Sequence, residues 1–176
     1  ALLSTQTELL FAFKIQSSKK SLTHRYICRY VVCMASPIAK LGNRRVTGKE
    51  QFYTPLSVAN WVVDRVLEVV PKHDGQIWLE PSAGSGSFIE ALAAKGYTDV
   101  VAMDIEPAHP KVLRQDFLSW NPTHENMIAI GNPPFGRNNS LSIPFFNRCA
   151  QFCDTIAFIV PRSWRKWSVT NRLNLD

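Results

Sequence analysis

The tetrapeptide Asn132-Pro133-Pro134-Phe135 carries the sharpest chemical signal in this sequence. Two consecutive prolines restrict the backbone and remove two N–H donors, which leaves nearby carbonyls free to accept from a ligand. The amide oxygen of Asn132 and the carbonyl of Pro133 can then accept both protons of one planar amino group. The ring of Phe135 offers a stacking face for a flat substrate. Such a site suits a nucleophile that is an sp² amine, and it needs no Ser, Cys or His nucleophile.

A turn of small residues, Glu80 to Phe88, lies between a predicted strand and a predicted helix. Its glycines, Gly84 and Gly86, allow a tight turn and a close approach of a ligand to the backbone. Glu80 stands at the strand end, where it can accept a hydrogen bond from a cationic or hydroxylated ligand. Ile89 replaces the third glycine of the dinucleotide-binding fingerprint, which argues against that motif. An ordinary strand-to-helix turn stays open as the alternative interpretation.

Acidic residues also follow two later strands. Asp104 closes a predicted strand 18 residues after Gly86, where an acid is placed to bind ribose hydroxyls. Asp116 could receive the exocyclic amino group of a bound adenine, and Phe117 could cover the face of that ring. Asp116 and Phe117 are explained equally well as a loop acid beside a core aromatic. The acidic residues support a ligand site only because they agree with the glycine turn.

Alternating helices and strands must position these residues. Apolar residues recur at helical spacing over 56–70, and Pro71 ends that helix. Further helices are predicted at 88–95 and 142–153, and strands at 76–80, 100–105, 112–117, 127–130 and 155–160. Strands that alternate with helices indicate an α/β fold with a parallel sheet and crossover connections. Because a doubly wound sheet usually continues further, we expect this one to be truncated after its fifth strand.

Together these motifs resemble the S-adenosylmethionine-dependent amino-group methyltransferases, and especially the adenine-N6 DNA methyltransferases. The resemblance rests on the segment Gln51 to Pro55, the glycine turn, the two strand-end acids and the Asn-Pro-Pro-Phe motif, in that order. It covers about residues 50–165. It implies a Rossmann-like methyltransferase fold, with a mostly parallel sheet and helices on both faces.

The resemblance also assigns roles to individual residues. S-adenosylmethionine is expected to lie against a cofactor set of ten residues: Phe52, Thr54, Pro55, Glu80, Ala83, Gly84, Gly86, Asp104, Asp116 and Phe117. The expected catalytic set is Asn132, Pro133, Pro134 and Phe135, with the first two holding the target amino group and the aromatic ring stacking on a flipped base. No metal is expected, because the histidines form no cluster and the cysteines are better explained by packing.

Three functions stay open on this evidence. Methyl transfer to adenine N6 in DNA or RNA is favoured, because the motif ends in Phe135 and the segment Gln51 to Pro55 is typical of the nucleic-acid branch. A protein glutamine-amide methyltransferase is the second, although its motif usually ends in Tyr. A non-catalytic, cofactor-binding remnant of the fold is the third. Only 41 residues follow Phe135, fewer than a separate target-recognition region needs, so the domain 49–176 is expected to be C-terminally incomplete.

Charge and composition set the remaining expectations. Hydrophobic residues make up 45% of the 176 residues, enough for a packed core, and no apolar run is long enough to cross a membrane. Residues 1–49 carry nine bases and one acid, whereas the rest has a net charge of −2. We therefore set residues 1–48 apart as a basic extension, disordered or transit-like. The protein is expected to be intracellular, in an organelle if residues 1–33 are a true transit segment, unless translation starts at Met34.

One further run, Trp164-Arg165-Lys166-Trp167, mixes bases with aromatics. It could hold a nucleic acid through stacking and phosphate contacts. It could equally be a partly buried loop. The oligomeric state has no signature in the sequence.

Overall fold

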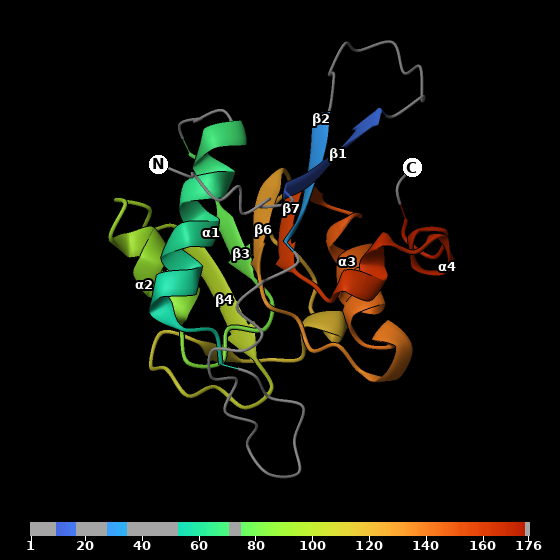
Figure 1. Cartoon of the computed structure of the whole chain (residues 1–176). Helices are drawn as coiled ribbons and strands as arrows, with labels where there is room; N and C mark the ends of the chain where they lie inside the picture. The colour runs from blue at the N-terminus through green and yellow to red at the C-terminus, as the bar shows by residue number, and fades with distance from the viewer. Residues whose placement is uncertain (1–9, 17–27, 35–52, 71–74, 175–176) are drawn as a thin grey trace, which may run out of the picture.

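The computed structural model describes residues 10–16 and 28–34 as backbone, and residues 53–70 and 75–174 with their side chains (Figure 1). The strands are β1 (Leu10–Gln16), β2 (Cys28–Met34), β3 (Trp78–Glu80), β4 (Val100–Asp104), β5 (Leu113–Arg114), β6 (Met127–Gly131) and β7 (Cys153–Ile159). The α-helices are α1 (Leu56–Val69), α2 (Ser87–Ala93), α3 (Ser142–Cys149) and α4 (Trp167–Thr170). Short 3₁₀ helices are η2 (Phe117–Ser119), η3 (Arg137–Asn139) and η4 (Arg162–Arg165).

The sheet has the strand order β1-β2-β7-β6-β3-β4-β5. The five strands β3 to β7 are all parallel to their neighbours, β2 joins β7 in parallel, and β1 joins β2 antiparallel. Every residue of β3 and β6 is buried. Continuous burial is typical of central strands in a parallel sheet that helices cover on both faces.

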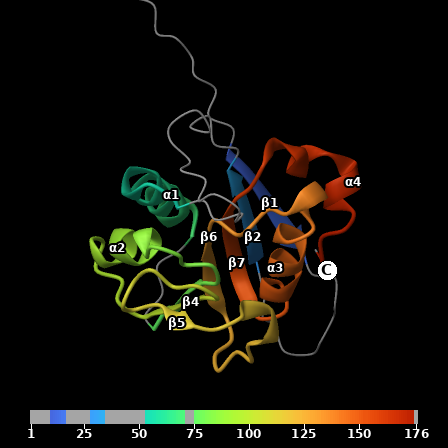
Figure 2. The ribbon, with the colours of Figure 1, turned by 90° about the horizontal axis from the view of Figure 1, so that it is seen from below.

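Helices cover the two faces of the sheet, as Figure 2 shows. Side chains alternate across a strand, so Trp78 and Leu79 of β3 enter different cores. Trp78 joins the core formed with α1 and α2, where Val62 and Phe88 are buried. Leu79 joins the core formed with α3, where Phe146 is fully buried. This three-layer arrangement confirms the α/β Rossmann-like methyltransferase fold that the sequence predicts.

Two predicted elements are much shorter in the structure. The strand expected at 112–117 is reduced to the two exposed residues of β5, at the sheet edge, where no further strand pairs with it among the described residues. The helix expected at 142–153 ends at Cys149, because the chain turns there to enter β7 at Cys153. The last strand expected, 155–160, corresponds to β7, and η4 and α4 follow it within the described part of the chain.

Strands β1 and β2 lie within residues 1–48, although that segment shows no steady strand period. Their backbones pair over seven residues, and β2 continues the sheet beyond β7. The separation of a basic extension from a domain at 49–176 stays a prediction, as does a transit segment. Within the described ranges, no helix is long and apolar enough to span a membrane.

Candidate active site at the carboxyl edge of the sheet

The carboxyl ends of β3, β4 and β6 open onto one cleft of about 570 Å³. This volume is in the range of pockets that bind small ligands. The main cleft is lined by Tyr53, Pro81, Ser82, Gly84, Asp104, Ile105, Glu106, Gln115, Asp116, Phe117, Leu118, Asn132, Pro133, Pro134, Leu141 and Phe145. A smaller pocket adjoins it and shares four of these residues, Tyr53, Ser82, Gly84 and Asn132. Ligand sites of α/β sheets lie at this edge of the strands.

Asp104 fixes the glycine turn to the end of β4. Its Oδ2 accepts a hydrogen bond from the backbone N–H of Gly84 at 2.8 Å, and its Oδ1 accepts from the N–H of Glu106 at 2.8 Å. Each carboxylate oxygen keeps a second lone pair for a hydroxyl donor. Gly84 has φ +48°, and a Cβ there would lie 3.1 Å from the Tyr53 ring. The positive φ and the close approach to the Tyr53 ring therefore favour glycine at this position.

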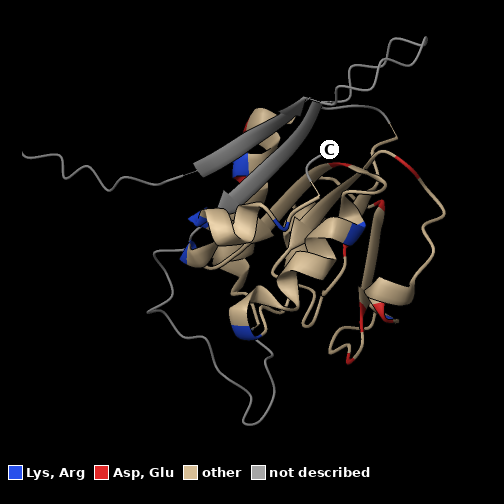
Figure 3. Cartoon of the chain, turned by 90° about the vertical axis from the view of Figure 1, so that its right-hand side faces the viewer, with Lys and Arg blue, Asp and Glu red and all other residues tan. Residues whose placement is uncertain are grey.

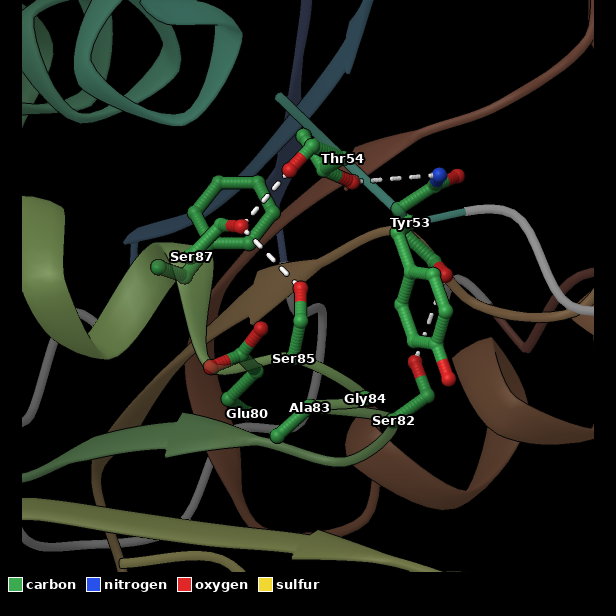
Figure 4. A pocket seen from close by; sticks show the side chains of 10 residues that line it. Tyr53, Thr54, Glu80, Ser82, Ala83, Gly84, Ser85 and Ser87 are labelled. Carbon is green, nitrogen blue, oxygen red and sulfur yellow. Dashed lines mark hydrogen bonds between the residues drawn. The ribbon is translucent and has the colours of Figure 1, made fainter. Parts of the chain in front are cut away.

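Glu80 is a buried acid at the end of β3 (Figure 4). Its side chain lines the smaller pocket, and its Oε2 has no hydrogen-bond partner among the described residues. Burial, and then repulsion from the Asp104 carboxylate, raise the pKa of Glu80 well above its ordinary value, against an opposing hydrogen bond from the Ile89 backbone. Burial of this oxygen without a partner is unfavourable, and a ligand that brings a positive charge or a hydrogen-bond donor would remove that cost.

Asn132 is oriented by Thr54, which lies 78 residues earlier in the chain. Its Nδ2 donates to Thr54 Oγ1 at 3.3 Å, and Ser87 holds the Thr54 carbonyl with a hydrogen bond of 2.6 Å. The Asn132 backbone carbonyl accepts from Ser82 Oγ at 3.4 Å. Asn132 Oδ1 is buried and has no partner in the described part of the chain. The amide thus offers its acceptor oxygen at the junction of the two pockets.

Most of the predicted site residues line these pockets. Thr54, Glu80, Ala83, Gly84 and Asn132 line the smaller pocket. The main cleft adds Asp104, Asp116, Phe117, Pro133 and Pro134. Phe117 is only 1% exposed, because its ring packs beside Phe145, Trp120 and Phe152. Residues from five separate segments therefore meet at one edge of the sheet.

Other predicted residues lie elsewhere. Pro55 is the N-cap of α1, where its carbonyl accepts from Val58 and Ala59. Gly86 is the left-handed N-cap of α2, and a Cβ there would meet the His109 ring at 2.6 Å. Phe135 does not line either pocket, and its carbonyl accepts from the N–H groups of Leu141 and Ser142. Phe52 lies outside the described residues.

Several lining residues were not singled out from the sequence. Tyr53 lines both pockets, and its position between the predicted site residues Phe52 and Thr54 could have indicated this. Ile105 and Leu118 are 64% and 40% exposed, and each directly follows a predicted site segment. Their apolar side chains give the cleft walls that suit a flat ring. Over the ranges that the structure describes, no three His, Cys, Asp or Glu side chains form a group that could hold a metal.

No protein-family model matches the chain. Over 95 residues, 52% of the chain, it is 30% identical to the type II methyltransferase M.HincII of Haemophilus influenzae. It has the same identity over the same length to the type II methyltransferase M.HindII of the Rd strain of that species. The matched segment covers 18% of either relative, so the chain corresponds to a small part of their length. Fold and similarity together support a relationship to methyltransferases.

Glu80 should make the ligand-free protein less stable as the pH rises. Its pKa is higher in the folded state than in the unfolded state, so its contribution is fully present below the ordinary value of 4.5 and is lost as the pH rises through the folded pKa. Glu80→Gln should remove this part of the decline when unfolding free energies are measured by denaturant titration across pH. The variant Glu125→Gln, altered at an exposed position, serves as the control. An unchanged pH profile for Glu80→Gln would contradict the interpretation.

Proposed function

We propose that this chain transfers a methyl group from S-adenosylmethionine to the N6 amino group of adenine in a nucleic acid. The observation that carries the proposal is the Asn132 amide, whose donor is used by Thr54 and whose acceptor is left for a ligand. An amide held in this way selects a hydrogen-bond donor such as an amino group. The similarity to two type II methyltransferases supports the same reaction class.

The described residues fit S-adenosylmethionine. Glu80 Oε2, which is buried and has no partner among the described residues, suits the cationic end of that molecule. The Asp104 carboxylate, which lines the main cleft, suits ribose hydroxyls. Asp116, Ile105 and Leu118 lie where the main cleft can receive a flat base. When bound, the cofactor supplies an electrophilic methyl group.

Asn132 and Pro133 would act on the target amino group. Asn132 Oδ1 accepts one of its protons, and the carbonyl of Pro133 can accept the other. This contact favours the nitrogen as the attacking atom, because it draws electron density from the N–H bonds toward the nitrogen lone pair. Thr54 is a positioning residue here, since its hydroxyl accepts a hydrogen bond from Asn132 Nδ2 and so leaves Asn132 Oδ1 for the ligand. An adenine in a duplex must be flipped out of the stack to reach this amide.

A labelled-methyl transfer assay tests the function. The full chain is offered duplex DNA, RNA and a glutamine-bearing protein in parallel, with radioactive S-adenosylmethionine. We expect label on the nucleic acid, and N6-methyladenine after digestion. Label on protein glutamine would support the amide methyltransferase instead. Cofactor binding without transfer to any of the three would support a non-catalytic remnant and contradict the proposal.

Phe135 is proposed to stack on the flipped base. Phe135→Ala should weaken capture of the base by roughly 1–3 kcal/mol, while Phe135→Tyr should change it little because a phenol ring stacks as well. The measurement is the KM for a DNA substrate, compared with kcat at saturation. Since the ring does not line the cleft of the ligand-free protein, it must turn to reach the base. Equal KM values for the alanine, tyrosine and unaltered proteins would rule the stacking role out.

A further inference from the structure

Outside the basic N-terminal segment the net charge is −2, but acidic and basic residues are unevenly distributed along this part of the chain. Residues 50–135 hold five bases and eleven acids. Residues 136–176 hold six bases and two acids, Asp154 and Asp176. The positive half begins directly after the Asn-Pro-Pro-Phe motif. Positive charge is thus concentrated in the segment of the chain that follows the proposed target site.

The positive half forms one face of the molecule. Figure 3 looks at the side that carries α3 and α4, and it shows Lys and Arg on this side. Five of the six bases are exposed: Arg137 in η3, Arg162 and Arg165 in η4, Lys166 between η4 and α4, and Arg172 after α4. Next to Lys166 stands Trp167, which is 77% exposed. An exposed Trp beside cations is costly to leave in water and suits contact with a base or sugar.

Hydrogen bonds join this face to the loop that follows the motif. Asn139 Nδ2 donates to Ser163 Oγ at 3.2 Å, which connects η3 to η4. Arg172 Nη1 donates to the carbonyl of Asn138 at 3.3 Å, which connects the residues after α4 to the same loop. The loop then returns to the motif, because the N–H of Leu141 donates to the Phe135 carbonyl at 3.3 Å. The bases therefore belong to a framework continuous with the cleft.

The two tryptophans of the run 164–167 have different roles. Trp164 is 4% exposed, packs edge-on against Phe146 and donates its Nε1 hydrogen to Ser142 Oγ. It anchors η4 to α3. Trp167 lies on the surface with Lys166. Trp164 therefore fits the interpretation of this run as a partly buried loop, whereas Trp167 is accessible to a nucleic acid.

We propose that the basic face, defined by Arg137, Arg162, Lys166, Trp167 and Arg172, binds the phosphate backbone of DNA beside the flipped base. Its charge is opposite to that of DNA, and guanidinium groups match phosphate oxygens in geometry. The position of the target base rests on the proposed function, whereas the binding of DNA by this face does not.

Salt-dependent DNA binding tests the proposal. Binding of the full chain to a fluorescent duplex of mixed sequence is followed by anisotropy over a range of salt concentrations, without cofactor. The double variant Arg162→Gln/Lys166→Gln should bind more weakly. Its slope of log affinity against log salt should be shallower by about 0.9 for each DNA phosphate that the variant no longer neutralises. Trp167→Ala should weaken binding about tenfold.

Two control variants remove the same number of charges elsewhere. Arg65→Gln/Lys95→Gln alters bases that pair with Glu68 and Asp64 on the α1 and α2 side, and it should keep the slope of the unaltered protein. Lys19→Gln/Lys20→Gln alters the basic N-terminal segment. The proposal is overturned if only this last variant has a shallower slope, if the Arg162→Gln/Lys166→Gln slope is unchanged, or if the chain does not bind DNA. Since no turnover is measured, these outcomes are separate from failure of methyl transfer.

Discussion

Replacing Asn132 by alanine should lower the rate of methyl transfer by about 10²–10³ while cofactor affinity stays nearly unchanged. The side chain offers a buried acceptor, Oδ1, whose proposed partner is the target amino group. Removing it leaves the amino group without the hydrogen bond that strengthens as the nitrogen attacks. The loss therefore falls on the reaction step. Single-turnover rates measure that step, and calorimetric titration with S-adenosylmethionine measures the cofactor affinity.

Asn121→Ala is the matched control for this variant, because Asn121 is exposed in the loop after η2 and lines neither pocket. It should transfer methyl at the rate of the unaltered protein. Asn132 also donates to Thr54, so its removal could displace that residue as well. Preserved cofactor affinity would show that the pocket is intact. If Asn132→Ala transfers methyl as fast as the unaltered chain, the amino-methyltransferase mechanism is wrong.

The central elements could be predicted from sequence because their local signals agree with their packing. The valines at helical spacing in α1 form its buried face, and the helix ends at Val69, one residue before the predicted end. Strand β6 is an unbroken apolar run of the kind that central parallel strands need. Edge strands are harder: β5 keeps two exposed residues. Strand β2 depends on backbone pairing with β7, and β1 depends on pairing with β2, while their own sequence shows no steady strand period.

The sequence could predict which residues meet at the cleft where those residues stand at strand ends. Asp104 is the last residue of β4, and Asn132 directly follows β6. Parallel strands bring such positions to the same edge of the sheet. The contact between Thr54 and Asn132 joins residues 78 positions apart, and no local pattern indicates it. Gly86, by contrast, was predicted to contact the cofactor but does not line either pocket. Its positive φ makes glycine necessary, yet His109 and not the cleft lies beside it.

Replacing Gly84 by valine should abolish measurable binding of S-adenosylmethionine. The residue has φ +48°, so any side chain is strained, and its Cβ would already lie 3.1 Å from the Tyr53 ring. The added methyl groups of valine have to displace that ring or enter the cleft that Gly84 lines. They would also disturb the 2.8 Å hydrogen bond from the Gly84 N–H to Asp104, the residue proposed to hold the ribose. Calorimetric titration measures the effect.

Gly96→Val separates obstruction of the cleft from backbone strain. Gly96 also has a positive φ, +83°, but no described atom lies within 4 Å of a Cβ there. Both variants should lose stability, by roughly 1–3 kcal/mol for a residue held in a disfavoured conformation. Only Gly84→Val should lose the cofactor, whereas Gly96→Val should bind it like the unaltered chain. Circular dichroism and thermal melting establish that both variants fold. If folded Gly84→Val binds S-adenosylmethionine as tightly as Gly96→Val, the cofactor does not lie against this turn, and the cofactor set has to be sought elsewhere along the sheet.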